Sequence, residues 1–335
     1  MQLNDTILLN ALPALVVLII VEALFLAKEH RQQNKDIFTN ISAGAIAVLV
    51  TLLTKGIVLY TYSFIYQFRL FTLPQQVWYA WVICFFADDF SFYWHHRLSH
   101  KIRFLWASHM VHHSSEKFTF STAVRSSWTS NLSGVFLFWA WMPLIGIEPS
   151  MVLFLKTASI AYQFWLHTET IHKMPKLFEG VFNTPSHHRV HHGSDVQYLD
   201  KNHAGTLIIW DKFFGTYQTE TYKPTYGLTQ NIHSFNLLVI EFFGWKQLMN
   251  DLKKSKSIKD CLHYLFDAPG WSRDGSSKTT KQLQAELTAN KIHRGSIGEI
   301  AFHQKSILAN RTAGKLQLTN SNKLQWITTP YTDAG

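Results

Sequence analysis

Three closely spaced groups of histidines constrain this chain of 335 residues more than any other feature. Two of them fall in HHRLSHKIRFLWASHMVHH, residues 95–113, and the third falls in TPSHHRVHHG, residues 184–193. Side chains three or four positions apart lie on one face of a helix, so each group can direct its imidazoles at one cavity. The histidines with this spacing are His96, His100, His109, His112, His113, His188, His191 and His192.

A metal site explains this pattern better than separate core or surface histidines. A single histidine is more often a hydrogen-bonded core or surface residue, but three groups at helical spacing are hard to obtain by chance. One tetrahedral zinc takes about four ligands, whereas two ions of higher coordination number would use all of these imidazoles. The sequence therefore predicts a pair of metal ions. Imidazole binds zinc, iron, copper and nickel, so the ligand type leaves the metal open.

The composition indicates a membrane protein with a soluble portion. Hydrophobic residues make up 47% of the chain and charged residues 16%, below the roughly 25% of soluble proteins. The net charge of +9 favours anionic lipid over nucleic acid as a partner, because no nucleic-acid-binding motif is present. The two cysteines, Cys84 and Cys261, cannot form a disulfide framework or a cysteine-based cluster.

Apolar segments predict several membrane crossings, since roughly 20 helical residues span a bilayer. The expected crossings are residues 8–27, 37–66, 77–94, 132–147 and 151–167. Lys28, Arg31 and Lys35 place the first loop on the cytoplasmic side and the N-terminus outside. The last two segments form a hairpin that returns to the cytoplasmic face, so all three histidine groups meet there.

The expected fold is therefore all-α. It is a multi-span membrane helical bundle with a cytoplasmic helical cap that holds a histidine-rich di-metal site. Three regions are expected: N-terminal transmembrane spans at 1–75, a catalytic domain at 76–220, and a cytoplasmic C-terminal region at 221–335. The last region is expected to contain one exposed helix after residue 275 and a flexible tail.

An acidic residue near the first histidine pair is a candidate support for a ligand. Asp89 lies seven residues before His96, about two helical turns, at the inner end of an apolar segment. A carboxylate there can accept a hydrogen bond from an imidazole N–H and orient the ring. The alternative is an interfacial carboxylate that pairs with Arg97 or Arg103.

Three further residues lie close to the predicted site along the chain. His167 ends the apolar hairpin and is a candidate ninth ligand, although a lone histidine is more often a core residue. Glu169 follows two residues later and is a candidate partner of a ligand ring. His203, after the third histidine group, is a candidate for reaching the metals.

The quoted histidine segments also carry a family resemblance. DFSFYWHHRLSH, HHSSE, QFWLHTE, NTPSHHRVHHG and KNHAGTLIIWDKFFGTY resemble the fatty acid hydroxylase/sterol desaturase superfamily of membrane-bound non-haem iron enzymes, over residues 80–220. Within it the chain is most similar to the alkylglycerol monooxygenases. The resemblance implies a di-iron centre with the eight grouped histidines as ligands, and it matches His167 to a histidine that recurs in the superfamily.

The resemblance also implies an activity. A di-iron oxygenase of this kind hydroxylates or oxidatively cleaves C–H bonds of a lipid such as an ether lipid. The alternative is a sterol or fatty-acyl desaturase on the same di-iron site. Its electrons would come from an external reductase or a reduced pterin, and the alkylglycerol likeness favours tetrahydrobiopterin. The membrane would be a bacterial inner membrane or the endoplasmic reticulum. Lys101 stands where the animal alkylglycerol enzymes carry an acidic residue, which leaves the lipid open.

Two other classes of protein bind metals with histidines in membranes. A zinc-dependent hydrolase would need a carboxylate base within its motif, as in HExxH, and none of the three groups contains one. A metal transporter would place polar ligands near the bilayer midplane, whereas these histidines lie at the inner ends of apolar segments. The sequence disfavours both.

Overall fold

The computed structural model describes residues 2–26, 31–289, 317–318 and 324–325. It divides into two compact units, Met1–Thr280 and Lys281–Gly335. In the second unit residues 281–289 are helical, and β1 (Gln317–Leu318) pairs antiparallel with β2 (Leu324–Gln325). The helix agrees with the expected one, and most of the expected tail lies outside the described residues. The boundaries expected at residues 75 and 220 fall inside the first unit, so their meaning as domain limits stays a prediction.

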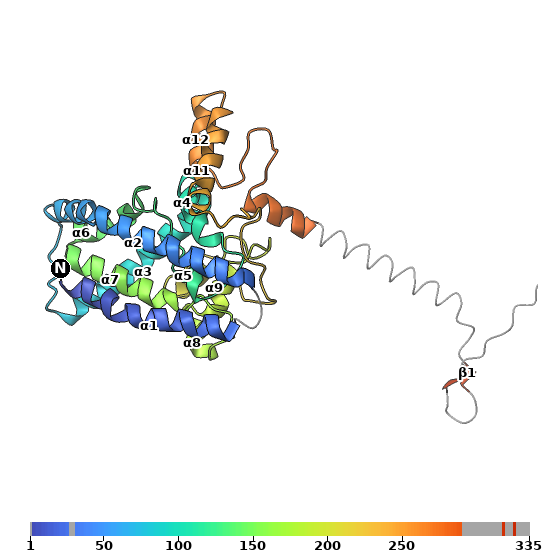
Figure 1. Ribbon diagram of the computed structural model, residues 1–335, viewed down its shortest axis with the longest axis horizontal. Coiled ribbons are helices and arrows are strands. Elements are labelled where there is room, and N and C mark those ends of the chain that lie inside the picture. The colour runs from blue at the N-terminus through green and yellow to red at the C-terminus, as the bar shows by residue number, and fades with distance from the viewer. Residues whose placement is uncertain (1, 27–30, 290–316, 319–323, 326–335) are drawn as a thin grey trace, which may run out of the picture. The chain divides into compact units, whose positions relative to one another are not determined.

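The first unit is built from helices (Figure 1). They are α1 (Gln2–Leu26), α2 (Arg31–Tyr66), α3 (Trp78–Lys101), α4 (Arg103–His113), α5 (Phe120–Ala123), the 3-10 helix η1 (Val135–Trp139), α6 (Trp141–Ile145), α7 (Pro149–Phe164), α8 (Lys176–Val181), α9 (Pro185–His191), α10 (Ile209–Phe213), α11 (Leu237–Lys253) and α12 (Ile258–Phe266). Figure 1 shows α1, α2 and α7 side by side, and α7 also packs against α3. The prediction of an all-α fold is confirmed for this unit.

One helix among the described residues has the length and composition to cross a membrane. It is Asn34–Tyr66 within α2, with a mean hydropathy of 2.0 over its most apolar window. Its apolar side chains are widely exposed, and Leu53 and Tyr60 are 75% and 73% accessible. The helix already begins at Arg31, so the basic loop expected at residues 28–35 largely belongs to it. Crossings by other segments stay predictions.

The apolar segment at 132–147 is not the single continuous helix that its composition predicts. Turns run to Gly134, and the short helices η1 and α6 follow. Gly134 and Gly146 have φ angles of 78° and 105°, in the left-handed region, and they interrupt the helical path at both ends. A Cβ on Gly146 would lie 2.2 Å from the carbonyl oxygen of Phe71, so only glycine fits this turn. The second limb of the expected hairpin is present as α7.

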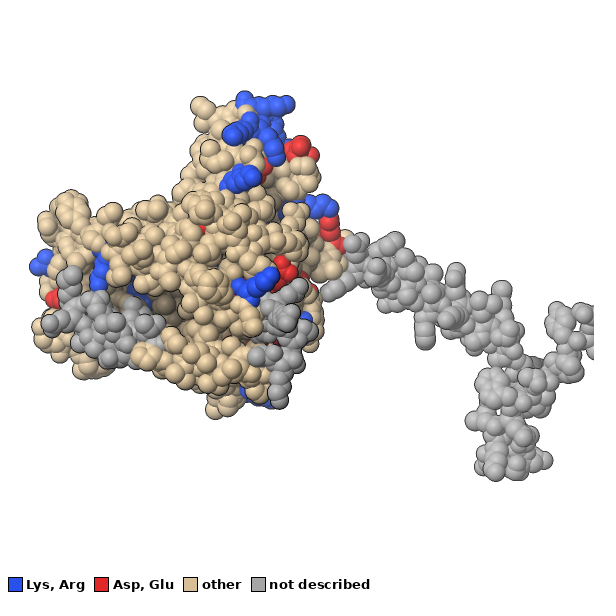
Figure 2. Space-filling view, in the orientation of Figure 1, with Lys and Arg blue, Asp and Glu red and all other residues tan. Residues whose placement is uncertain are grey.

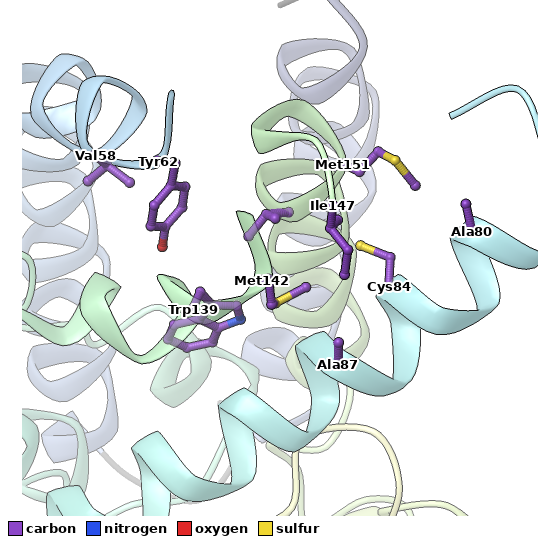
Figure 3. Close-up of a cluster of buried hydrophobic side chains, with 10 residues drawn as sticks. Val58, Tyr62, Ala80, Cys84, Ala87, Trp139, Met142, Ile147 and Met151 are labelled. Carbon is purple, nitrogen blue, oxygen red and sulfur yellow. The ribbon is translucent and has the colours of Figure 1, made fainter. Parts of the chain in front are cut away.

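A buried cluster fixes the short helices against α2 and α3 (Figure 3). Figure 3 shows Trp139 and Met142 between Tyr62 of α2 and Ala87 of α3. The Tyr62 hydroxyl donates to the carbonyl of Phe136 at 2.6 Å, which satisfies this polar atom within the apolar cluster. The cluster holds the first half of α3, whose second half carries the first histidine pair.

Candidate metal centre

A sharp turn between α3 and α4 brings the first two histidine groups together. Ile102 has extended backbone angles, φ −111° and ψ 119°, so α4 departs in a new direction immediately after α3 ends. As a result the ring of His100 at the end of α3 lies against rings of α4. Its centroid is 5.0 Å from that of His109 and 4.7 Å from that of His113.

Local sequence signals place the third group on the short helix α9. Thr184 is the N-cap and accepts a hydrogen bond from the backbone N–H of His187, and Pro185 occupies the first helical position. The helix therefore starts where the chain reaches α3 and α4. The ring of His191 lies 4.2 Å from that of His96, and the ring of His192 lies 4.3 Å from that of His113, measured between centroids.

The structure brings all nine candidate ligands into two adjacent groups. The ligand atoms within each group lie within 4.8 Å of one another. The five-histidine group contains His96, His100, His109, His113 and His191, and the four-histidine group contains His112, His167, His188 and His192. This is the arrangement expected for two ions, and His167 joins the set although it stands alone in the sequence.

Each H-x2-H-H motif divides its ligands between the two groups, rather than directing all three at one cavity. The outer residues of the motif in α4, His109 and His113, are four apart and enter the five-histidine group, whereas His112 enters the other. In the motif on α9 and its C-cap, His188 and His192 belong to the four-histidine group, whereas His191 belongs to the five-histidine group. Neighbouring helical positions point about 100° apart, so one helix end can serve two centres on either side of it.

Backbone carbonyl groups hold the outer nitrogens of four rings. The Nδ1 atoms of His96, His191, His112 and His167 lie 2.8, 2.9, 3.1 and 2.9 Å from the carbonyl oxygens of His203, Lys201, Arg125 and Gln163, respectively. A carbonyl can only accept, so each Nδ1 carries the proton and donates it. The tautomer that remains has a free lone pair on Nε2, the atom that a metal ligand needs.

The inner nitrogens lack the partners that buried polar atoms require. Nε2 of His100, His191 and His192 is buried without a hydrogen-bond partner among the described residues. Other inner nitrogens face one another, such as those of His188 and His167 at 2.9 Å. Unsatisfied buried nitrogens are costly, and a shared cation removes that cost. The donor set therefore fits two metal ions.

Burial keeps these imidazoles neutral. It lowers the pKa of His112 to about 4, although the hydrogen bond to the Arg125 carbonyl opposes the shift. Burial, followed by repulsion from neighbouring imidazoles, also lowers the pKa of His113, His191 and His192 well below 6.5. Metal binding needs the deprotonated ring, which this environment supplies at neutral pH.

Asp89 has neither of the partners expected from the sequence. Its carboxylate accepts hydrogen bonds from the backbone N–H groups of Thr206 and Leu207 at 2.7 and 3.0 Å, and from the indole of Trp210 at 2.9 Å. Thr206 and Leu207 belong to the loop after α9, which lies against α3. Because their backbone N–H groups and the Trp210 indole occupy the carboxylate, it does not bind an imidazole or an arginine. Asp89 thus anchors the loop whose carbonyl holds His96.

The two remaining candidates lie beside the groups, outside both. The ring of His203 contacts those of His96, His100 and His191, and neither of its nitrogens has a partner among the described residues. Glu169 accepts a hydrogen bond from the Tyr226 hydroxyl at 3.1 Å and is 37% exposed. Any role of these residues at the metals stays a prediction.

A buried arginine network behind the four-histidine group was missed by the sequence analysis. Nη1 of Arg125 lies 3.4 Å from an Asp36 carboxylate oxygen and 2.7 Å from the side-chain oxygen of Asn40, both on α2. Its Nε donates to the carbonyl of Val111 on α4 at 3.1 Å. Arg125 thereby joins α2 to the end of α4, while its own carbonyl holds His112. The only signal in the sequence is the presence of two charged residues, Asp36 and Arg125, in segments without strong periodicity.

A second missed group lies behind the five-histidine group. Lys101 donates to Asp200 at 2.6 Å, and the other oxygen of that carboxylate lies 3.7 Å from Nδ1 of His100. Burial would raise the pKa of Asp200, but His100 and Lys101 outweigh it and hold this pKa below its usual range. Lys101, which departs from the resembled enzymes, is thus one contact away from a candidate ligand.

Comparisons with known proteins agree with the site. Residues 81–216 match the family model described as Fatty acid hydroxylase. Alkylglycerol monooxygenase of Homo sapiens is 38% identical over 253 residues, which cover 75% of this chain and 56% of that protein. The Danio rerio protein of the same name is 39% identical over 238 residues, covering 71% and 53%. Ornithine lipid hydroxylase of Rhizobium tropici is 26% identical over 129 residues, covering 38% and 39%.

The chain spans little more than half the length of the alkylglycerol monooxygenases named above. No solved structure matches it. The matched region contains α4 and α9 with their histidine motifs, so the resemblance found in the sequence is confirmed where the candidate ligands lie. Residues 81–216 of this chain thus match the fatty acid hydroxylase family, and all nine candidate ligands lie within this range.

Proposed function

We propose that this chain is a membrane-bound di-iron monooxygenase that hydroxylates a C–H bond of a lipid, with ether lipids as the preferred class. The observation that carries the proposal is the division of nine neutral imidazoles, seven of them buried and two half-buried, into two adjacent groups of five and four. Alkylglycerol monooxygenases and an ornithine lipid hydroxylase among the relatives support an oxygenase that acts on lipids. The names of the two 38–39% identical relatives favour ether lipids.

In this proposal each histidine group holds one iron ion. Iron bound by neutral imidazoles supplies the activation of O₂, which an unactivated C–H bond requires. The protein's own residues position the ligands and keep the centre dry. Backbone carbonyls fix the rings, and Trp106 and Phe118 lie against His100 and His192 with centroids 5.1 and 5.0 Å apart. Electrons come from outside the chain, from a reduced pterin such as tetrahydrobiopterin or from a reductase.

The exposed apolar surface supports insertion in a bilayer. Large apolar side chains are exposed on α1 and on the first half of α3 as well as on α2, for example Phe25 at 74% and Trp78 at 78%. Such a surface is costly in water and ordinary in lipid. We infer a multi-pass protein whose metal centre lies at the cytoplasmic ends of these helices, in a bacterial inner membrane or the endoplasmic reticulum.

The proposal is tested by metal analysis and isotope labelling of the full chain in lipid nanodiscs. We expect about two irons per chain, in line with the two ligand sets, and label from ¹⁸O₂ in an alkylglycerol supplied with a reduced pterin. His109→Ala should lose iron and labelling. His172→Ala, which changes an exposed histidine outside both groups, is the matched control and should keep both.

Each alternative outcome has a distinct meaning. Labelled sterol or fatty acid in place of labelled alkylglycerol would keep the di-iron oxygenase and reject the ether-lipid class. An introduced double bond without label would indicate desaturation on the same centre. Tightly bound zinc that iron cannot replace, with no oxygen-dependent turnover, would reject the oxygenase itself.

A further inference from the structure

The outer face of α12 carries an apolar stripe that the fold leaves uncovered. Ile258, Leu262 and Phe266 are spaced four apart, so they lie along one side of the helix. Their exposed fractions are 82%, 50% and 57%. A continuous stripe of three large apolar side chains differs from the scattered apolar residues of an ordinary protein surface.

The opposite face of α12 is firmly anchored, so the exposed stripe is not a sign of a loose helix. Ser257 caps the helix by accepting from the backbone N–H of Asp260 at 3.1 Å. The buried carboxylate of Asp260 binds Nη1 of Arg273 at 2.6 Å, and Tyr264 packs edge-on against Trp271. The fold therefore holds α12 in one orientation and presents the stripe outward.

Lysines surround the start of this stripe. Lys253, Lys254, Lys256 and Lys259 are all exposed, and Lys254 also pairs with Asp251 at 3.1 Å. Figure 2 shows basic side chains, with a few acidic ones beside them, at the tip and along one side of the projection formed by α11 and α12, whereas the other visible side carries no charged atoms. A helix with an apolar side beside a cluster of lysines has the chemistry of a segment that lies on an anionic bilayer.

The position of α12 fits that surface. In Figure 1, α11 and α12 stand across the α1–α2–α7 bundle instead of running along it. If α2 crosses the bilayer, a helix that stands across α2 lies parallel to the bilayer plane. The projection is joined closely to the metal centre, because α11 packs on α4, and a Cβ on Gly244 would lie 2.6 Å from the carbonyl oxygen of Ala107.

We propose that α12 lies in the headgroup region of an anionic phospholipid bilayer, with Ile258, Leu262 and Phe266 among the acyl chains and the neighbouring lysines on the headgroup phosphates. The proposal rests on the membrane insertion in the proposed function and adds a second, peripheral contact with the lipid surface. Through α11 and α4 this contact also fixes the helix that carries His109, His112 and His113 relative to the surface from which a lipid substrate arrives.

Site-directed spin labelling of the full chain in nanodiscs tests the proposal. In a Cys261→Ser background, with buried Cys84 left in place, nitroxides are attached at Leu262→Cys and at Lys256→Cys. We expect the label at position 262 to collide several-fold less with a water-soluble nickel chelate than the label at 256, and more with oxygen. This shielding should be greater in phosphatidylglycerol than in phosphatidylcholine bilayers. It should decrease when Lys253, Lys254 and Lys259 are replaced by glutamine.

A third label, at Leu53→Cys on exposed α2, separates this proposal from the one on which it rests. If position 53 is shielded by lipid while position 262 is as accessible to the chelate as 256, the surface contact is rejected and the membrane insertion stands. If position 53 is also accessible, both are rejected. Shielding at 262 accompanied by dipolar broadening between labels would assign the stripe to a second copy of the chain and overturn the lipid contact.

Discussion

The five-histidine group and the four-histidine group are similar in chemistry but differ in what supports them. Behind the five-histidine group lie Asp200 and Lys101, a charged pair that reaches the solvent at the 39% exposed lysine. Behind the four-histidine group lies Arg125, a cation only 3% exposed that joins α2 to α4. One centre is thus supported from a charged edge of the molecule, and the other from its packed interior.

This difference indicates how each centre should fail. A buried charge that loses its partner destabilises the whole fold, whereas a partly exposed pair mainly adjusts the ring beside it. Because α4 and α9 each contribute ligands to both groups, damage to a helix should affect both ions, while damage to a support should affect one. Both expectations can be tested with single substitutions.

The largest effect is expected from removing ligands on α9. His191→Ala and His188→Ala change residues one turn apart that serve different groups. Each should lower turnover by more than about 100-fold, since a direct ligand matters more than the outer partners whose loss costs 10–100-fold. Mössbauer spectra of ⁵⁷Fe-loaded protein should show a different iron site altered in each variant. His187→Gln, beside Tyr217 and outside both groups, is the control and should keep both spectra.

The second effect concerns the support of the four-histidine group. Arg125→Met leaves Asp36 buried without its cation and should reduce the free energy of unfolding by about 3–5 kcal/mol. Adding Asp36→Leu should recover part of this loss, because the unpaired charge is then gone. Chemical unfolding in detergent followed by tryptophan fluorescence measures both. An unchanged unfolding midpoint in Arg125→Met would show that the interior network contributes little.

The third prediction concerns acid. The pKa of His112 is about 4 in the folded chain and 6.5 in the unfolded chain, so the unfolded state takes up the proton first as pH falls. The metal-free protein should keep its full stability above pH 6.5 and lose about 3 kcal/mol from this residue between pH 6.5 and 4. Thermal unfolding across this range tests it. A thermal stability that does not change between pH 6.5 and 4 would contradict the burial of His112 in its neutral form.

The fourth effect concerns the support of the five-histidine group. Asp200→Asn removes the charge that faces His100 and should weaken iron at this group by about 10–100-fold, with the other ion unaffected. Lys101→Gln should have a smaller effect in the same direction, because it leaves the carboxylate in place. Competition with a calibrated chelator gives both affinities. Equal loss of both irons would show that the two supports are not separate.

The smallest effect is expected at Glu169. Its carboxylate is 37% exposed and pairs with Lys223, which is 75% exposed, so solvent screens the pair. Glu169→Gln should change the free energy of unfolding by less than about 1 kcal/mol and leave both irons in place. A loss of iron in this variant would instead give Glu169 the ligand-supporting role that the sequence indicated.

The sequence alone identified the eight grouped candidate ligands, because helical spacing of three and four residues is a local property that a chain displays without its fold, whereas His167 has no such spacing. The start of α9 also has a local cause, with Thr184 as its cap and Pro185 at the first helical position, although the sequence analysis did not use this signal. Helical structure and the apolar character of α2 were also predictable, since both follow from short-range composition. The continuous helix expected at 132–147 was wrong, since two glycines in left-handed conformations limit the helical stretch to residues 135–145 and this stretch is divided into η1 and α6.

Only the tertiary structure decided how the ligands are divided and what holds them. His112 and His113 are adjacent in the sequence, yet they enter different groups, because the direction of each ring matters only once α4 meets α9. The hydrogen bonds from His112 to the Arg125 carbonyl and from Thr206 to Asp89 each use a backbone group. Every residue has such groups, so the residue type does not predict these bonds. Such hydrogen bonds depend on the path of the loops in the folded chain, which the spacing of residues in the sequence does not determine.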